Sequence, residues 1–303
     1  MEVVYGSERL SAQARAVAIG NFDGVHLGHR QVLDHLLTLS KGTGASPWVY
    51  TFDPPPTVVI APERHQPRLV TLAHKLELLA GLGVSGVVVE PFTAAFAAQS
   101  AEMFAREVLR GRLGASAVAV GWDFRFGSGR GGDVDALRAA LPGVDVTQVA
   151  PLLRDGEPVS SSRIRRLIQA GDLDAAAAFL DRPHRLSGTV VHGDARGRTI
   201  GFPTANIANE VECLPALGVY AVRARLPDGI WRPAALNLGV RPTFNGVGQR
   251  VEVHILDWAG DAYGQPLDVD IVRRIRGEQR FPSMEALVAQ IRADIVACRA
   301  ILV

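Results

Sequence analysis

The sequence predicts two domains, a parallel α/β domain followed by a smaller domain built mainly of β-strands. A chain of 303 residues exceeds the usual length of a single domain. Its first half alternates short β-rich runs with helical patterns, which is typical of a parallel sheet covered on both faces. Near residues 182–184 the helical pattern stops and short strand-like runs with polar turns replace it. We therefore expect one domain at residues 1–183 and another at 184–303.

The first domain is expected to alternate five strands with helices. The predicted strands cover residues 16–19, 48–52, 86–89, 117–120 and 144–149, and helical patterns cover 71–80 and 101–109. Ligands of open parallel sheets bind at the carboxyl ends of the strands. The segments that follow strands, at residues 20–29, 51–56, 121–127 and 160–165, are therefore the candidates for a site.

The strongest chemical signal follows the first strand, where residues 20–29 read Gly-Asn-Phe-Asp-Gly-Val-His-Leu-Gly-His. Gly20 and Gly24, on either side of Phe22, let the backbone approach a ligand closely. A pattern with helical spacing follows, so His26 and His29 lie on one face at a helix N-terminus, which favours phosphate. The pair can donate hydrogen bonds to charge that develops on a transferred phosphate. The alternative is a pair of capping or surface histidines.

A second candidate is the serine-rich start of another helix at residues 160–165. The hydroxyls of Ser161 and Ser162 and the guanidinium of Arg165 suit the β- and γ-phosphates of a nucleotide. The alternative is an ordinary serine N-cap, which is common at helix starts.

The second domain reads as short strands followed by one closing helix. The strand-like runs cover residues 188–191, 218–226, 231–238, 250–256 and 267–271, and the helical pattern covers 283–301. Several short strands with polar turns predict a small barrel or a sandwich.

Two features of the second domain carry chemistry. Gly193, Gly197 and Gly201 recur every four residues and suggest a loop close to a phosphate. Thr204 and Asn206 share a face of an extended segment and offer hard oxygen ligands suited to Mg²⁺. The alternative is a turn at the polar start of a strand.

The remaining candidate is a carboxylate in a strand. Glu252 alternates with the apolar Val251, Val253 and Ile255, so it leaves the apolar face. A general base and a solvated barrel residue both fit this pattern.

Residues 20–29 resemble the His-x-Gly-His nucleotidyltransferases, and the longer string resembles the subgroup that adenylylates FMN. Residues 51–56, 121–127 and 160–165 are similar to further segments of that module, in the same order. The resemblance implies ATP and phosphate contacts from residues 20–29 and 160–165 and flavin contacts from Asp123 and Phe124. One departure is Pro55, which stands where the family usually has histidine.

Residues 193–206 closely resemble the riboflavin kinase signature, whose core is Gly-x-Pro-Thr-Ala-Asn. Residues 218–220, 237–243 and 251–254 match further pieces in order, as do Arg276 and Phe281 before the last helix. The resemblance implies an ATP loop that includes Pro203, Mg²⁺ held by Thr204 and Asn206, and flavin contacts from Arg276 and Phe281. It also implies that Glu252 takes the proton of a ribityl hydroxyl.

The whole chain thus resembles the prokaryotic-type bifunctional riboflavin kinases/FAD synthetases. The resemblance implies a Rossmann-like nucleotidyltransferase domain and a small antiparallel barrel with a terminal helix. The implied reactions convert riboflavin and ATP to FMN, then FMN and ATP to FAD and pyrophosphate, with Mg²⁺. Pro55 keeps open a different acceptor for the first domain, such as a nicotinamide or pantetheine phosphate. A flavin-binding regulatory protein is the alternative outside enzymes.

Composition and the absence of targeting patterns narrow the possible partners and the possible cell compartment. A net charge of +1 gives no electrostatic case for nucleic acid or for an anionic membrane. Cys213 and Cys298 have neither metal-ligand spacing nor the pattern of a disulfide framework. The sequence carries no signal-peptide pattern and no window of about 18 apolar residues. We therefore expect a cytoplasmic protein with small-molecule substrates; a homo-oligomer stays open.

Overall fold

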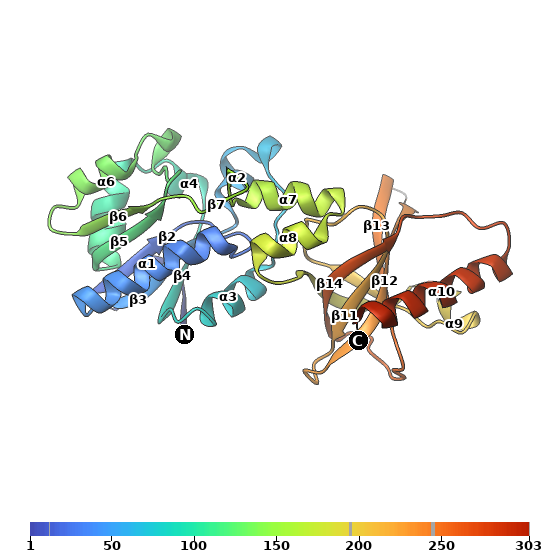
Figure 1. Ribbon diagram of the computed structural model, residues 1–303. Helices are drawn as coiled ribbons and strands as arrows, with labels where there is room; N and C mark the ends of the chain where they lie inside the picture. Colours follow the sequence, from blue (N-terminus) through green and yellow to red (C-terminus); the bar gives the residue numbers. More distant parts are fainter. Residues whose placement is uncertain (12, 194–195, 244–245, 303) are drawn as a thin grey trace. The chain divides into compact units, whose positions relative to one another are not determined.

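The computed structural model describes residues 1–11, 13–193, 196–243 and 246–302. The chain forms two compact units. Unit 1 comprises Met1–Gln66 and Leu72–Ser161, and unit 2 comprises Pro67–Thr71 and Ser162–Val303. Figure 1 labels many of the helices and strands of both units.

Unit 1 is built on a six-stranded sheet in which every neighbouring pair of strands is parallel. The strand order is β1-β4-β3-β2-β5-β6, for β1 (Glu2–Tyr5), β2 (Arg15–Ile19), β3 (Ser46–Asp53), β4 (Gly86–Pro91), β5 (Ala115–Gly121) and β6 (Asp145–Val149). The expected parallel α/β fold is confirmed. The edge strand β1 was not among the predicted strands.

Helices pack on both faces of this sheet. The helices of unit 1 are α1 (Leu27–Thr43), α2 (Pro56–Ile60), α3 (Leu72–Ala80), α4 (Ala94–Ala97), α5 (Ala101–Met103), the π-helix η3 (Phe104–Arg112) and α6 (Val134–Ala140), with short 3₁₀ turns η1 (Ser7–Arg9), η2 (Pro62–Arg64) and η4 (Ser128–Arg130). A small hairpin, β7 (Leu153–Arg154) and β8 (Glu157–Pro158), follows β6. Helices α1 and α3 pack in one core, whereas η3 and α6 pack in the other.

The two faces of the central strands carry side chains of different size. The face toward α1 presents small residues, which are Ala16, Ala18, Ala117 and Ala119. The opposite face presents Val17, Ile19, Val118 and Val120. Since successive residues of a strand point to opposite faces, this alternation lets one continuous apolar run serve two cores.

The strand order of the sheet reverses at β2. From β2 the chain proceeds to β3 and β4 on one side, then crosses to β5 on the other side of β2. In open α/β sheets the crevice at such a reversal, at the carboxyl ends of the strands, binds the ligand. The loops after β2 and β5, at residues 20–26 and 122–127, begin at this edge.

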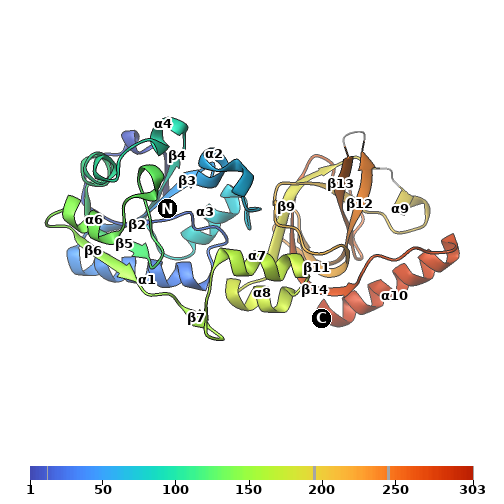
Figure 2. The ribbon, with the colours of Figure 1, turned by 90° about the horizontal axis from the view of Figure 1, so that it is seen from above.

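Unit 2 is a closed antiparallel barrel with strand order β10-β13-β12-β11-β14-β9 (Figure 2). The strands are β9 (His184–Val191), β10 (Ala205–Asn209), β11 (Gly218–Arg225), β12 (Trp231–Thr243), β13 (Gly246–Ile255) and β14 (Pro266–Arg276). Pairing of β9 with β10 closes the sheet, so the barrel prediction is confirmed.

Four helices complete unit 2. They are α7 (Ser161–Ala170), whose first residue belongs to unit 1, α8 (Leu173–Leu180), the short α9 (Arg196–Thr199) and α10 (Met284–Leu302). Helix α10 buries Cys298 and Leu302 against Ala221 of β11 and Leu256 after β13. Among the described residues, no helix combines the length and apolar character needed to cross a membrane.

Candidate active sites

The loop after β2 is held in an unusual backbone conformation. Phe22 and Val25 have φ of 47° and 40°, and Gly24 has φ of 84°. Positive φ is strained for a β-branched residue, at about 1–3 kcal/mol. Burial offsets the strain, since Phe22 and Val25 are only 2% and 1% exposed in the core under α1. The first glycine, Gly20, donates its N–H to the carbonyl oxygen of Tyr50 in β3 at 3.1 Å.

The two motif histidines stand together where α1 begins. His26 is the N-cap, and its Nδ1 accepts a hydrogen bond from the N–H of His29 at 3.3 Å. The two rings stack with centroids 3.6 Å apart, and the ring of Phe22 meets His29 edge-on at 5.2 Å. Because Nδ1 of His26 accepts, its neutral ring carries the proton on Nε2, which makes Nε2 a donor. The structure thus brings together the predicted Phe22, His26 and His29.

Gly28, between the histidines, is required by space. A Cβ there would lie 3.0 Å from the carbonyl oxygen of Val159 and 3.2 Å from the ring of His26. The glycine therefore lets the first turn of α1 pack directly on the backbone before α7.

The predicted serine-rich helix start is also present. Ser161 begins α7, and its Oγ donates to the carbonyl oxygen of Asp23 in the histidine loop at 2.9 Å. Ser162 and Arg165 belong to unit 2, where Nε of Arg165 donates to the carbonyl oxygen of Pro67 at 2.7 Å.

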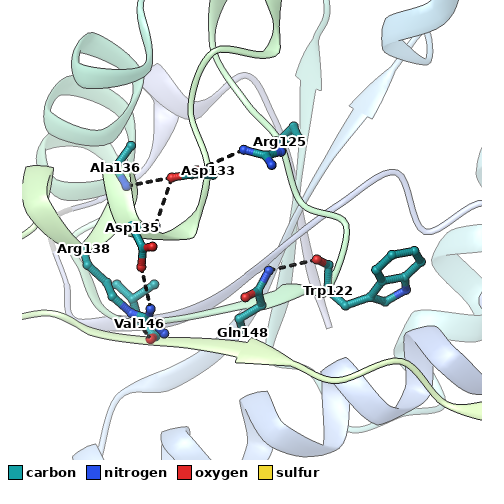
Figure 3. A network of polar contacts seen from close by, with 8 residues as sticks. All are labelled: Trp122, Arg125, Asp133, Asp135, Ala136, Arg138, Val146 and Gln148. Atoms are coloured by element: carbon teal, nitrogen blue, oxygen red, sulfur yellow. Dashed lines mark hydrogen bonds and ion pairs between the residues drawn. The ribbon is translucent and has the colours of Figure 1, made fainter.

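The loop after β5 exposes aromatic and acidic groups at the same sheet edge. Trp122 is 48% exposed, and its carbonyl oxygen accepts a hydrogen bond from Nε2 of Gln148 at 2.9 Å (Figure 3). The predicted flavin residue Asp123 is exposed, and Phe124 stacks on Phe126 with centroids 5.3 Å apart.

An ion pair holds the far side of that loop. Nη1 of Arg125 donates to Oδ2 of Asp133 at 3.0 Å (Figure 3). The other carboxylate oxygen of Asp133 accepts from the N–H groups of Asp135 and Ala136 and caps α6. The arginine thereby anchors the loop to the start of a helix, and the cap holds the pKa of Asp133 below its ordinary value.

In unit 2, the predicted metal and base residues meet across neighbouring strands. Asn206 of β10 is the direct register partner of Glu252 in β13, and Glu252 is the partner of Asn237 in β12. Residues opposite each other share a face. Val251 and Val253, the strand neighbours of Glu252, are only 4% and 1% exposed. Glu252 and its two partners therefore lie on the outer face of the barrel wall.

The Glu252 carboxylate is surrounded by donors. Oε1 accepts from Nη2 of Arg250 at 2.8 Å and from Oγ1 of Thr204 at 3.4 Å. Oε2 accepts from Nδ2 of Asn237 at 3.4 Å. The Glu252 side chain is 17% exposed, so it is enclosed yet reachable. A carboxylate in this setting can take a proton from a hydroxyl that enters the site.

The glycine segment folds closely over the two proposed metal ligands. A Cβ at Gly193 would lie 2.2 Å from the side chain of Asn206, and one at Gly197 would lie 3.4 Å from Oγ1 of Thr204. Gly201 has φ of 86°. Residues 194 and 195, inside this segment, lie outside the described residues. The donor set of one hydroxyl and one amide oxygen fits Mg²⁺, which keeps several waters and takes few protein ligands.

A cleft of about 280 Å³ adjoins this cradle. Its lining includes Pro203, Thr204, Trp258 and Tyr263. The ring of Tyr263 stacks on His192 with centroids 3.9 Å apart, and the carbonyl oxygen of Pro203 accepts from Nδ1 of His254 at 2.7 Å. An apolar cleft with aromatic walls beside a polar cradle suits a ring that carries phosphates.

The predicted flavin residues of unit 2 lie in contact with each other. The guanidinium of Arg276 stands 5.6 Å from the ring centroid of Phe281. Asp294 of α10 binds that guanidinium on two sides, from Nε at 3.0 Å and from Nη2 at 2.8 Å. The side chain of Glu278 packs against Gly239 of β12, two residues after Asn237. A Cβ at Gly239 would lie only 2.8 Å from Oε1 of Glu278.

Sequence reasoning did not select Asn237 and Arg250 as site residues. Asn237 alternates with the buried Leu236 and Leu238, the same signal that selected Glu252. Arg250 lies two residues before Glu252 and therefore on its face. The pattern placed both outside the apolar core, but their contacts depend on the register between strands.

Comparisons with known proteins match both halves of the chain to flavin-cofactor enzymes. Residues 9–163 match the family model described as FAD synthetase, and residues 180–302 match the model described as riboflavin kinase. The bifunctional riboflavin kinase/FMN adenylyltransferase of Escherichia coli (strain K12) is 39% identical over 304 residues, with 99% of this chain and 97% of the relative covered. The enzyme of the same description from Pseudomonas fluorescens is 39% identical over 306 residues, with 99% and 98% covered.

A solved structure also matches along the whole chain. It is described as a macrolide-efflux protein from Streptococcus pneumoniae, with a TM-score of 0.89, 29% identity and 99% of both chains covered.

Proposed function

This chain belongs to the family of bifunctional riboflavin kinases/FMN adenylyltransferases, and we propose how its residues divide two ATP-dependent transfers. Riboflavin and ATP give FMN and ADP, and FMN and ATP then give FAD and pyrophosphate. We assign adenylyl transfer to residues 1–183 and the kinase to residues 184–303. Family membership favours FMN as the acceptor over the nicotinamide or pantetheine phosphates that Pro55 kept open. It likewise favours an enzyme over a flavin-binding regulatory protein.

The observation that carries the kinase assignment is the row of Asn206, Glu252 and Asn237 beside Thr204. Glu252 takes the proton of the ribityl hydroxyl while that oxygen bonds to the γ-phosphorus and the bond to the β-phosphate oxygen breaks. Oε2 is the better acceptor of this proton, because Oε1 already accepts from Arg250 and Thr204. A general base of this kind contributes about 10²- to 10⁴-fold.

Thr204 and Asn206 would hold Mg²⁺, which supplies charge neutralisation on the phosphates when bound. Gly193, Gly197, Gly201 and Pro203 bring backbone close to those phosphates. The cleft beside Thr204 takes the nucleoside part of ATP, with the ring of Trp258 or Tyr263 against the base. Arg276 and Phe281 contact the flavin.

In unit 1 a phosphate oxygen of FMN attacks the α-phosphorus of ATP, and the bond to the β-phosphate oxygen breaks to release pyrophosphate. Nε2–H of His26 and the ring of His29 donate to the developing charge, aided by the N-terminus of α1. Gly20, Phe22 and Gly24 shape the loop, and Ser161, the last residue of unit 1, binds the leaving phosphates. For Ser162 and Arg165 of unit 2, near the start of α7, we also propose phosphate binding. Asp123 and Phe124 contact the flavin.

Chromatographic product analysis tests the proposal. The full chain is given riboflavin, ATP and Mg²⁺, and FMN and FAD are followed over time. FMN first and FAD later is the expected result. FMN alone would overturn the assignment of unit 1, whereas the absence of both products from folded protein would overturn the whole proposal.

A further inference from the structure

Arg250 connects the two groups on which the proposed kinase chemistry depends. From β13 its Nη2 reaches Oε1 of Glu252 at 2.8 Å, and its Nε donates to Oδ1 of Asn206 at 3.3 Å. The Arg250 side chain is 23% exposed, so the bridge is largely shielded from water. Among the described contacts, this guanidinium links the carboxylate of one strand to the amide of the next.

The guanidinium suits this task because its donors have a fixed planar geometry. A donor that holds Oδ1 of Asn206 fixes which end of the amide faces the site, since arginine only donates. The amide oxygen keeps a second lone pair for a cation, and Oε2 of the carboxylate, which accepts from Asn237, keeps a second lone pair for a proton. Arg250 can therefore orient both groups without consuming the atoms that act.

We propose that Arg250 is a positioning residue for phosphoryl transfer, which fixes Glu252 and Asn206 in one geometry through a single guanidinium. The proposal rests on the proposed role of Glu252 as base. Arg250 acts through its two neighbours and touches no reacting atom. Misplacement of catalytic groups by about 1 Å can cost on the order of 100-fold in rate.

The test compares R250M and R250K with R225M. Arg225 is a matched control, because its Nη2 pairs with Asp268 at 2.8 Å with similar exposure on the same barrel, away from Glu252. We expect R250M to lower kcat for FMN formation by about 10- to 100-fold with KM for riboflavin nearly unchanged. R250K keeps the charge but not the two-pronged contact, and should retain an intermediate kcat. R225M should keep the kcat of the unaltered chain.

Two further readouts separate positioning from loss of fold. Conversion of added FMN to FAD, measured on the same preparations, should not change, and riboflavin affinity measured by flavin fluorescence should stay within about twofold. If R250M melts early, R250K carries the comparison, because it preserves the ion pair with Glu252. An unchanged kcat in R250M, or equal kcat losses in R250M and R225M, would overturn the proposal.

The double variant R250M/E252Q decides whether Arg250 acts through the base. Residues that share one function are non-additive, so R250M should cost clearly less when E252Q is already present than in the unaltered chain, and the loss that remains reports the orientation of Asn206. The same fold-loss in both backgrounds would refute positioning of Glu252 by Arg250. E252Q without effect would instead refute the proposed function itself, so the two failures are distinguishable.

Discussion

Asn206 and Glu252 are direct cross-strand partners, paired between β10 and β13 on the outer wall of a closed barrel. The pairing places the amide proposed to hold Mg²⁺ beside the carboxylate proposed as the base, and Arg250 contacts both side chains. Register is strongly specified here, because a slip of one residue would turn the buried Val251 and Val253 outward. The separation of the two backbone positions is therefore as stable as the barrel.

Glu252→Gln should lower kcat for FMN formation by about 10²- to 10⁴-fold, because the amide keeps the shape but cannot take the proton. Conversion of FMN to FAD, assayed on the same preparation, should be unchanged. Equal losses in both steps would contradict separate sites.

His29→Asn should let FMN accumulate while FAD formation falls by at least about tenfold, since the imidazole proposed to donate to the transferred phosphate is replaced by a shorter amide. His35→Asn is the control on the same helix, because His35 is exposed and its ring contacts only local backbone at Gln31 among the described contacts. FAD formation that survives His29→Asn would argue against the phosphate role of the motif.

Gly28→Ala should impair FAD formation although no chemical group is removed. The new Cβ would meet the Val159 carbonyl oxygen and the His26 ring at 3.0 and 3.2 Å, so the start of α1 must shift. Gly42→Ala is the control in the same helix, since apart from its chain neighbours and the nearby backbone of α1 no atom would lie within 4 Å of the new Cβ. That change should stabilise by about 0.5–1 kcal/mol. Thermal melting and FAD assays of both variants provide the comparison.

Asp294→Asn should destabilise unit 2 by about 3–5 kcal/mol, because it leaves the guanidinium of Arg276 without its buried counter-charge. It should also raise KM for riboflavin through Phe281. The exposed pair of Arg299 with Asp257, where α10 meets the segment after β13, offers a contrast. Asp257→Asn should leave the urea midpoint almost unchanged. Similar losses in both variants would mean that burial does not set the difference.

Stability of unit 2 should fall as the pH drops from about 6.5 towards 4. His184 is buried, and desolvation lowers its pKa to about 4, while its Nε2 donates to the carbonyl oxygen of Cys213 at 2.8 Å. In the unfolded chain His184 binds a proton as the pH falls through about 6.5, whereas in the folded chain it stays neutral until about 4. The contribution of neutral His184 to stability is therefore complete above pH 6.5 and is lost on acidification. The full loss amounts to about 3 kcal/mol.

Denaturant unfolding at pH 7.5 and pH 5 measures this dependence. His184→Gln keeps a donor for the Cys213 carbonyl oxygen but does not titrate, so its stability should change less between the two pH values. An equal pH dependence in both proteins would show that other groups cause it.

Much of the fold was predictable because buried segments consist of apolar residues. Runs such as Val87–Val89 are apolar throughout because both faces of a parallel strand are covered. The edge strand β1 was not predicted because it has no such apolar run. Of its four residues only the two in the middle are partly buried, and the two at the ends are exposed. The π-helix η3 was predicted only as a helix, since apolar spacing does not reveal a locally widened turn.

For the sites, local motifs were informative and long-range contacts were not. The histidine loop could be predicted because its candidate residues are neighbours in sequence. The bridge from Arg250 to Asn206 spans 44 positions, so it arises from strand pairing and leaves no sequence spacing to detect. The hydrogen bond from Arg165 to Pro67 likewise joins residues 98 positions apart.

The alanines beneath α1 act as a spacer whose thickness sets the height of the histidines above the sheet. Ala16, Ala18, Ala117 and Ala119 present only methyl groups to that helix, and larger side chains there would lift it. Larger side chains at these four positions would thus shift His26 and His29 at the start of α1, although none of the four is a candidate for contact with a nucleotide. Selection for catalysis would then act on the interior of the domain as strictly as on its reactive edge.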